Sequence, residues 1–283
     1  MNEHDSEVIA GMLSELGYTE SKERKNAGIV IINTCSVREN ADKRFFGTLG
    51  QLKRRKEEGD DFLMCVCGCM MQQQHIIDTI KQKYPWVDII FGTHNIHEFP
   101  RLVENVVAEK KKVTDVWEDG GEIVEGLPAK RLYRHKAFVN ITYGCNNFCT
   151  YCIVPYTRGR ERSRKPEKIT AEIRALAEDG VKEVMLLGQN VNSYKGESAD
   201  GSGLVDFPDL LYRINEIDGI ERIRFMTSHP KDLSDKLIEA FTRCDKLCKC
   251  LHLPVQSGSS EVLRRMNRRY TKEDYLKLVE KLR

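Results

Sequence analysis

The sequence lacks the long apolar runs that a membrane-spanning helix requires. Its longest runs, Ile29 to Ile32 and Val87 to Phe91, are far shorter than the roughly 20 residues that cross a bilayer. The first residues, Met1 to Asp5, are polar and acidic, which is not the pattern of a secretory signal peptide. Internal repeats and low-complexity tracts are not evident either. We therefore expect a cytoplasmic protein with no contact to a membrane.

The sequence also lacks an excess of charge of one sign. Its 283 residues carry a formal net charge of +2, which is too small to indicate nucleic-acid binding without a local cluster of basic residues. Hydrophobic residues make up 40% and charged residues 31%, which is ordinary for a globular protein. The length suggests about two domains.

Cysteine, in contrast, is plentiful, with ten residues in the chain. In a reducing compartment a disulfide framework is not expected, so clustered cysteines indicate metal or redox chemistry. They form three groups: Cys35 with Cys65, Cys67 and Cys69; Cys145, Cys149 and Cys152; and Cys244, Cys248 and Cys250. The last group has no spacing typical of a metal loop and is interpreted as thiols that pack as small hydrophobes.

The first 107 residues alternate between helical and extended patterns. Hydrophobic spacing predicts helices over 4–17, 37–56, 72–83 and 96–107, and strands over 29–32, 62–66 and 87–91. Such alternation predicts a parallel sheet covered by helices. Because this domain opens with a helix where the pattern normally begins with a strand, we expect its first strand to be missing and the chain to start late, at an internal methionine.

The rest of the chain predicts a linker and a second domain. Residues 108–134 are charged and poor in apolar side chains, so domains are expected over 1–107 and 135–283 with this linker between them. Strands are predicted over 137–142, 183–187, 223–227 and 251–255, and helices over 169–180, 208–217, 233–244 and 272–282. Four strand–helix units do not close a barrel, so we expect a partial one.

Three cysteines, Cys145, Cys149 and Cys152, are packed into one short loop after the first strand of the second domain. Iron–sulfur cubanes usually take four thiolates, so three would leave one iron open. The amino and carboxylate groups of S-adenosylmethionine (SAM) could chelate that iron. Zinc loops usually need a second pair of ligands, so an iron–sulfur cluster is favoured over zinc or buried thiols. The end of a barrel strand is also where active sites lie.

The Cys-x-x-x-Cys-x-x-Cys spacing resembles the radical SAM superfamily. The longer stretch Gly144–Arg164 resembles the methylthiotransferases, and Asn33–Ala41 and Cys67–Met70 resemble their tRNA-modifying branch, the MiaB type. The resemblance covers essentially the whole chain. It implies an α/β protein with an N-terminal open parallel α/β sheet domain, here lacking its first strand, followed by a partial radical SAM (β/α) barrel, incomplete at the C-terminus.

The resemblance implies a transferase that methylthiolates carbon 2 of N(6)-isopentenyladenosine beside the anticodon of tRNA. One SAM would donate a methyl group to sulfur, and a second would be cleaved at the Cys145, Cys149 and Cys152 cluster to give the deoxyadenosyl radical. A reducing electron donor is implied, and we expect a monomer. The alternatives are the same reaction on threonylcarbamoyl-adenosine or a ribosomal-protein aspartate, which the stretch Ser36–Asn40 disfavours by resemblance, or an inactive truncated iron–sulfur or zinc fragment.

A second [4Fe–4S] cluster is implied in the N-terminal domain. The family holds it with three cysteines, two of which correspond to Cys35 and Cys69. Both follow predicted strands, at the sheet edge where ligands collect. The third family cysteine would precede the stretch Asn2–Glu7, so this cluster lacks a ligand here. Cys65 and Cys67 are interpreted as buried core residues rather than substitutes.

The loops after the later barrel strands hold the remaining candidates, and no catalytic residue is assigned. Cofactor-binding residues are predicted at the strand ends where barrel sites lie, with capped turns as the alternative: Gln189, Asn190, Asn192, Ser228, His229, Gln256 and Ser257. A basic rim that contacts tRNA phosphates is predicted from two groups: Arg158, Arg160, Arg162 and Arg164 with Lys165, and Arg264, Arg265, Arg268 and Arg269.

Overall fold

The computed structural model describes residues 1–36, 41–201 and 203–283. The chain divides into two compact units. The N-terminal unit comprises Asn2–Lys130 and Tyr156–Arg158, and the C-terminal unit comprises Met1, Arg131–Pro155 and Gly159–Arg283. The described part of the chain contains no helix that is long and apolar enough to cross a membrane.

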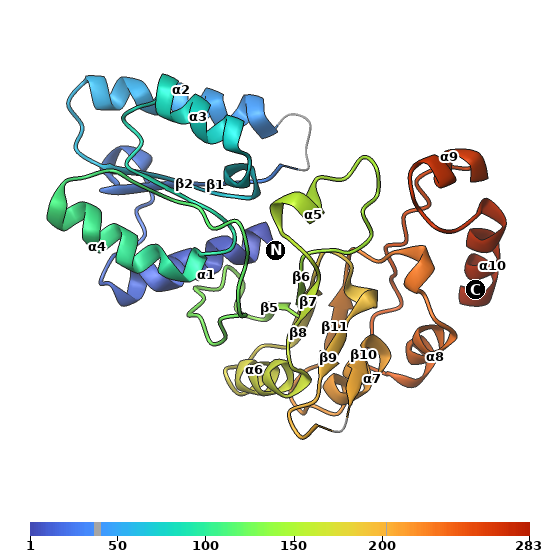
Figure 1. Ribbon diagram of the computed structural model, residues 1–283. Helices are drawn as coiled ribbons and strands as arrows, with labels where there is room; N and C mark the ends of the chain where they lie inside the picture. The colour runs from blue at the N-terminus through green and yellow to red at the C-terminus, as the bar shows by residue number, and fades with distance from the viewer. Residues whose placement is uncertain (37–40, 202) are drawn as a thin grey trace. The chain divides into compact units, whose positions relative to one another are not determined.

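The N-terminal unit is built on a parallel sheet of four strands in the order β1-β2-β3-β4. The strands are β1 (Ile29–Thr34), β2 (Leu63–Gly68), β3 (Ile89–Phe91) and β4 (Val113–Asp115). The helices are α1 (Asn2–Glu15), α2 (Ala41–Glu57), α3 (Gln74–Lys83) and α4 (Phe99–Glu109). Figure 1 shows α2 and α3 on one face of the sheet and α1 and α4 on the other. The predicted helix-covered parallel sheet is confirmed, although residues 37–40 of the predicted helix 37–56 lie outside the described residues.

Strand β2 separates the two layers of this core because its alternate side chains point to opposite faces. Met64 and Val66 pack in the cluster that contains α2 and α3, whereas Cys65 and Cys67 pack in the cluster that contains α1 and α4. Burial raises the pKa of both thiols above the ordinary value. Cys65 and Cys67 are therefore core residues, as predicted.

The edges of this sheet differ from the sequence prediction. At one edge, β4 lies inside the stretch 108–134 that was predicted to be a linker. Its three residues are too few to show an alternating pattern, and they follow the charged run Lys110–Lys112. At the other edge, a cavity of about 1050 Å³ runs along β1 and is lined by residues that include Ile9, Leu13 and Ile31.

The C-terminal unit has a parallel sheet of three strands in the order β11-β8-β5, together with two short antiparallel ribbons. The sheet strands are β5 (Lys136–Asn140), β8 (Glu183–Leu187) and β11 (Arg222–Phe225), and the ribbons are β6 (Thr142–Tyr143) with β7 (Arg162–Ser163) and β9 (Lys195–Glu197) with β10 (Leu204–Asp206). The helices that belong wholly to this unit are α6 (Pro166–Glu178), α7 (Phe207–Asn215), α8 (Asp235–Arg243), α9 (Ser260–Arg265) and α10 (Lys272–Leu282). The short helix α5 (Val154–Thr157) is divided between the two units after Pro155.

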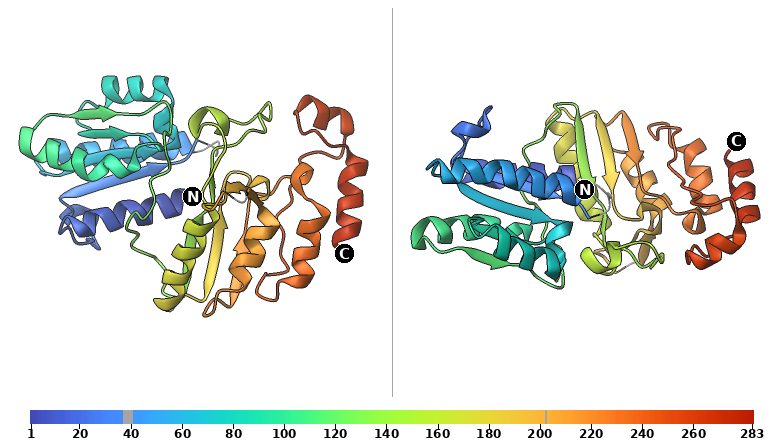
Figure 2. Two further views of the ribbon diagram at one scale, coloured as in Figure 1. Left: turned by 60° about the horizontal axis from the view of Figure 1, so that its bottom comes forward. Right: turned by 90° about the horizontal axis from the view of Figure 1, so that it is seen from above.

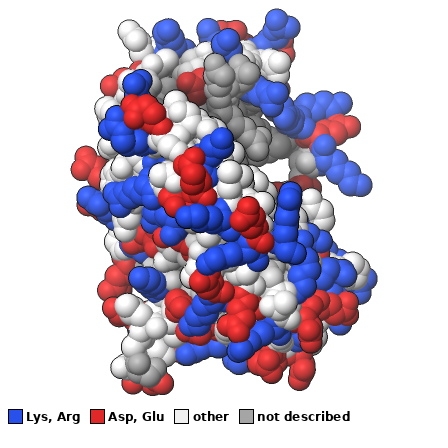
Figure 3. Space-filling model, turned by 90° about the vertical axis from the view of Figure 1, so that its right-hand side faces the viewer, with Lys and Arg blue, Asp and Glu red and all other residues white. Residues whose placement is uncertain are grey.

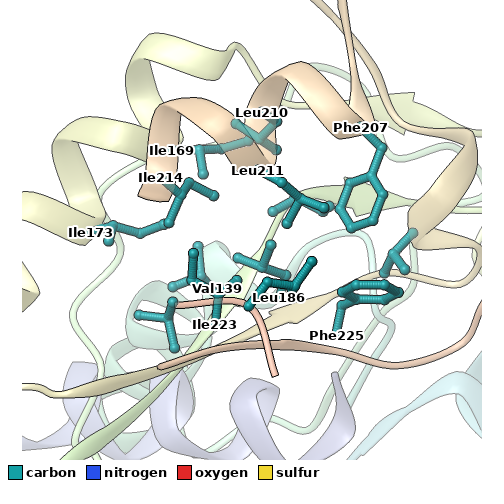
Figure 4. Packing of buried hydrophobic residues seen from close by; sticks show 14 of the residues in the cluster. Val139, Ile169, Ile173, Leu186, Phe207, Leu210, Leu211, Ile214, Ile223 and Phe225 are labelled. Atoms are coloured by element: carbon teal, nitrogen blue, oxygen red, sulfur yellow. The ribbon is translucent and has the colours of Figure 1, made fainter. Parts of the chain in front are cut away.

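The core of this unit lies between the sheet and its helices. Figure 4 shows Val139, Leu186 and Ile223, one from each strand, packed with Ile169 of α6 and Leu211 of α7. Burying a large apolar side chain contributes roughly 1.5–3 kcal/mol. These contacts hold the carboxyl ends of the three strands in fixed positions, and the candidate site is built there.

The prediction of a fourth barrel strand over 251–255 is wrong. These residues have no regular secondary structure. On the side of β11 that faces away from β8, the described chain makes a single β-bridge, from Ile223 to Leu247. Pro254 within this stretch has no N–H to donate to a ladder. Helices α9 and α10 follow it (Figure 2), and Lys281 Nζ lies 2.6 Å from Asp235 Oδ1, which joins α10 to α8.

Candidate functional site

The three cysteines predicted as cluster ligands lie in the loop between β6 and β7, whose antiparallel pairing closes the loop at its base. Gly144, directly before Cys145, has a φ of 73°, and a Cβ added to it would lie 2.1 Å from the carbonyl oxygen of Arg160. Glycine therefore permits the close approach in which Cys145 N donates to Gly159 O at 3.1 Å.

The three thiols share one electrostatic environment. Cys145 and Cys149 are buried, and Cys152 is half-buried. Burial, together with weaker effects from Cys152 and Cys149, raises the pKa of Cys145 to about 11. Burial also raises the pKa of Cys152, with Cys149 contributing. Within the described ranges, no three His, Cys, Asp or Glu side chains are grouped as ligands of a metal ion.

The segment after α9 supports this loop from outside. Met266 O accepts from Thr150 N at 3.2 Å, and Asn267 Nδ2 donates to the carbonyl oxygens of Asn147 at 3.2 Å and Phe148 at 2.9 Å. Asn267 has a φ of 56°, in the left-handed region that asparagine tolerates better than most residues. The loop is thus tied to residues more than a hundred positions further along the chain.

Four predicted cofactor-binding residues meet at the carboxyl ends of β8 and β11. Asn192 and His229 exchange two hydrogen bonds of 2.9 Å, since Asn192 Nδ2 donates to His229 O and His229 N donates to Asn192 Oδ1. Asn190 Nδ2 donates to Asp232 Oδ2 at 2.7 Å. Asn190, Asn192, Ser228 and His229 are all buried. Asn192 therefore joins the loops that follow β8 and β11. Each of the other three side chains has one polar atom with no hydrogen-bond partner among the described residues.

Four buried polar atoms at these strand ends have no hydrogen-bond partner in the described part of the chain: Asn140 Oδ1, Asn190 Oδ1, Ser228 Oγ and His229 Nε2. His229 Nδ1 accepts from Lys231 N at 3.2 Å, which places the ring proton on Nε2. Burial, with Arg268 contributing, lowers the pKa of His229 to about 3, so the ring is a neutral donor at physiological pH. Because buried polar groups are nearly always paired, these atoms indicate a polar ligand.

The other predicted cofactor-binding residues have different surroundings. Gln189 is half-buried next to Asn190. Gln256 is exposed with a φ of 69°, and Ser257 Oγ accepts from Ser259 N at 3.1 Å in the turn before α9. The contacts of Ser257 are therefore those of the alternative, a residue that caps a turn. Contact of these three residues with SAM stays a prediction.

The predicted basic rim is incomplete because three of its arginines, Arg158, Arg164 and Arg268, are buried. Arg158 Nη2 donates to Asp5 Oδ2 at 2.8 Å within the N-terminal unit, and Arg164 Nη2 lies 2.7 Å from Glu172 Oε2 within the C-terminal unit. The expectation of a surface position is wrong for these three residues. Arg158 and Arg164 are each paired with a carboxylate inside the fold. A buried cation requires such a partner.

Arg160 and Arg162, the other two arginines that follow the cysteine loop, are accessible to different degrees. Arg160 is exposed and lies over the Phe148 ring, with Cζ 4.6 Å from the centroid. Arg162 is half-buried, with Cζ 6.0 Å from the Tyr143 centroid. Figure 3 shows Lys and Arg side chains mixed with Asp and Glu over the face it displays.

The N-terminal unit brings its two predicted cluster ligands together. Cys35 follows β1 and Cys69 follows β2, and a hydrogen bond with Cys35 is the largest cause that raises the pKa of Cys69. Between the strand ends, Gly68 has a φ of 98°, and a Cβ there would lie 2.1 Å from Thr34 O. Arg158 Nε donates to Cys69 Sγ at 3.0 Å.

Sequence reasoning missed two residues of these sites. Asp5 pairs with Arg158 across 153 positions, and no local pattern announces such a contact. Asn140 is the last residue of β5, where the preceding residues are buried and apolar. A polar residue at the end of an apolar strand is the sequence signal that could have identified it.

The C-terminal unit thus combines a parallel α/β sheet with three thiols in one loop that follows its first strand. The sequence profile of the radical SAM superfamily matches residues 139–283, and that of the uncharacterized protein family UPF0004 matches residues 1–92. The chain belongs to the radical SAM superfamily. Membership implies SAM and a [4Fe–4S] cluster as cofactors.

Curated relatives are identical to the chain at more than half of the aligned positions. The tRNA-2-methylthio-N(6)-dimethylallyladenosine synthase of Clostridioides difficile is 55% identical over 281 residues, which are 99% of this chain and 58% of that protein. The enzyme of the same name from Caldicellulosiruptor saccharolyticus is 56% identical over 283 residues, which are 100% of this chain and 59% of that protein. The chain thus spans about three-fifths of the length of these relatives.

Solved structures support the fold at low sequence identity. The radical S-adenosylmethionine methyltransferase TsrM from Kitasatospora setae, solved with tryptophan substrate and a SAM analogue, has a TM-score of 0.64 at 14% identity and covers 99% of this chain and 62% of its own. Its structure with cobalamin and a [4Fe–4S] cluster gives a TM-score of 0.62 at 13% identity. At these identities the likeness shows the fold alone.

Proposed function

We propose that this chain is the cluster-binding part of a tRNA methylthiotransferase that acts on carbon 2 of N(6)-isopentenyladenosine beside the anticodon. The observation that carries the chemistry is a loop with three thiols beside unpaired, buried polar atoms at the carboxyl ends of β5, β8 and β11. The substrate assignment rests on relatives of that named activity at 55% identity. The enzyme would act in the cytoplasm as a monomer and draw electrons from a reducing partner.

The donor atoms fit the cofactors that membership implies. Cys145, Cys149 and Cys152 would hold a [4Fe–4S] cluster, and when bound it supplies, with SAM, the reductive cleavage of a carbon–sulfur bond. The three thiols would have to lose their protons to bind, and a cationic iron centre would oppose the rise that burial causes in the pKa values of Cys145 and Cys152. His229 Nε2–H and the Ser228 hydroxyl would donate to SAM oxygens, and Asn190 Oδ1 would accept from an N–H or hydroxyl donor.

The N-terminal unit would hold a second [4Fe–4S] cluster through Cys35 and Cys69. Support comes from the side-chain hydrogen bond between them and from Arg158, whose buried charge lies against the Cys69 sulfur. Asp5 keeps that guanidinium in place with a contact of 2.8 Å. Arg158 would orient Cys69 and offset thiolate charge, and Asp5 would hold Arg158 in place.

We predict a tRNA-binding effect of Arg160 and Arg162. In the Arg160→Glu/Arg162→Glu double variant, tRNA affinity is expected to fall about tenfold, and the slope of log affinity against log salt to fall by about 1 per lost phosphate contact. Filter binding over a salt series measures both. The matched control is Lys182→Glu/Arg222→Glu, which makes the same charge change at the amino end of β8 and β11. Equal losses in the two doubles would reject the assignment.

The function is tested by nucleoside mass spectrometry of tRNA from a methylthiotransferase-deficient strain that expresses the chain. We expect the 2-methylthio derivative of N(6)-isopentenyladenosine. A methylthio group on threonylcarbamoyl-adenosine instead would reject the substrate. Reductive SAM cleavage to 5′-deoxyadenosine is measured in parallel on anaerobically reconstituted protein. About four irons with neither cleavage nor modified nucleoside would reject the enzyme in favour of an inert iron–sulfur fragment.

A further inference from the structure

Arg268 is a buried arginine without a carboxylate partner. Among the described residues three arginines are buried, with 6%, 6% and 4% of their surface exposed for Arg158, Arg164 and Arg268. The first two pair with Asp5 and Glu172. No carboxylate among the described residues pairs with Arg268. A buried guanidinium is costly unless an anion accompanies it, so its surroundings should show where that anion lies.

The contacts of Arg268 lead to the cysteine loop. Its Nη1 donates to Cys149 Sγ and to the Tyr151 hydroxyl, at 3.3 Å in both cases. Its Nε donates to the Tyr270 hydroxyl at 3.2 Å, and this hydroxyl donates to Val255 O at 2.7 Å. The guanidinium therefore has hydrogen-bond partners at Nε and at Nη1. Nη1 contacts the sulfur of Cys149, a predicted cluster ligand.

The remaining amino group, Nη2, is buried and has no partner in the described part of the chain. A guanidinium has five N–H donors in a rigid plane, so an empty side of that plane marks a direction in which an acceptor is missing. The backbone fixes this geometry, because Asn267 next to it is bonded to the carbonyl oxygens of the same loop.

We propose that Arg268 is a positioning residue that donates a charge-assisted hydrogen bond to Cys149 in its cluster-bound form and stabilises the reduced state of that cluster. The proposal rests on the proposed function, because it needs a cluster on Cys145, Cys149 and Cys152. The thiolates and sulfides supply the anion that the buried guanidinium lacks. Hydrogen bonds and charge near the sulfurs are among the factors that set cluster potentials.

The direction of the effect follows from charge. On reduction, one electron passes from an external reductant such as dithionite to the cluster, whose net charge becomes more negative by one, and no bond is formed or broken. A positive charge beside Cys149 favours the more negative state, so its removal makes reduction harder. We expect the equilibrium constant for reduction to fall about tenfold, which corresponds to about 59 mV toward negative potential for a one-electron couple.

The test is a redox titration followed by electron paramagnetic resonance, without SAM, on the full chain carrying Cys35→Ser and Cys69→Ser so that one cluster is read. In Arg268→Met the midpoint potential should shift to more negative values. Arg268→Lys should lie between the two, because an ammonium keeps the charge but cannot reproduce the planar fork. The matched control, Arg269→Met, removes an exposed neighbouring charge and should leave the potential unchanged.

Three results would overturn the proposal. One is an unchanged potential in Arg268→Met or Arg268→Lys with the iron content intact. Another is a shift that appears only after SAM is added, which would assign the guanidinium to SAM. The last is loss of the cluster from both variants while Arg269→Met keeps it, which would make Arg268 a support for the loop alone. Absence of any cluster in the Cys35→Ser/Cys69→Ser parent would instead defeat the proposed function.

Discussion

Replacing Cys149 by alanine is expected to remove about four irons per chain and to reduce SAM cleavage to background. Two thiols would remain in the loop, and two protein ligands are too few for the cubane that three would hold. The measurements are iron and sulfide content after anaerobic reconstitution and 5′-deoxyadenosine formation with dithionite. The Cys35 and Cys69 pair is untouched, so iron bound in the N-terminal unit should stay.

Cys250→Ala is the matched control for this loss, because Cys250 is an exposed thiol outside the cysteine loop. It should retain wild-type iron content and SAM cleavage. Undiminished iron content and unimpaired cleavage in Cys149→Ala would show that the loop does not hold the catalytic cluster. Equal iron losses in the two variants would also contradict the assignment of Cys149 as a cluster ligand.

Gly144→Ala is expected to destabilise the C-terminal unit by about 3–5 kcal/mol, in the range of severe point mutations. Two costs combine at this residue. Its φ of 73° disfavours any side chain, and the new Cβ would lie 2.1 Å from Arg160 O and 2.5 Å from Gly159 O. Backbone atoms cannot move aside as a flexible side chain can, so the β6–β7 ribbon and the cysteine loop would have to shift. Hydrogen exchange of peptides from β5 and β8 against urea measures the change.

Gly180→Ala separates the two costs. Gly180 also has a positive φ, of 87°, but nothing lies within 4 Å of an added Cβ. Only the conformational penalty remains, and it should amount to about 1 kcal/mol. If the two variants lose the same stability, the close contact beneath the cysteine loop is not what makes glycine necessary at residue 144.

The local patterns of the sequence were sufficient for most elements. The helix predicted over 272–282 and the strand over 183–187 match α10 and β8 at both ends, because apolar spacing and capping act within a few residues. The strand predicted over 251–255 failed for a non-local reason. Its apolar residues pack beside the core without a ladder, since extended structure needs a neighbouring strand to pair with.

The spacing of cysteines along one short stretch likewise predicted the donor set of the site. Three thiols within eight residues, after a strand and before a helix, indicate cluster chemistry whatever surrounds them. The arginines could not be sorted in this way. Arg158, Arg160, Arg162 and Arg164 have the same charge and alternate along the chain, yet two of them are buried against Asp5 and Glu172.

By itself, then, the sequence determined the layer architecture, the cysteine loop and the strand-end residues, because these depend on periodicity and spacing over short distances. The tertiary structure alone decided which basic side chains reach the surface and which one contacts Cys149. Those outcomes depend on contacts between residues far apart in the chain, such as Arg268 with Cys149 across 119 positions. Local sequence patterns cannot predict contacts between residues so far apart in the chain.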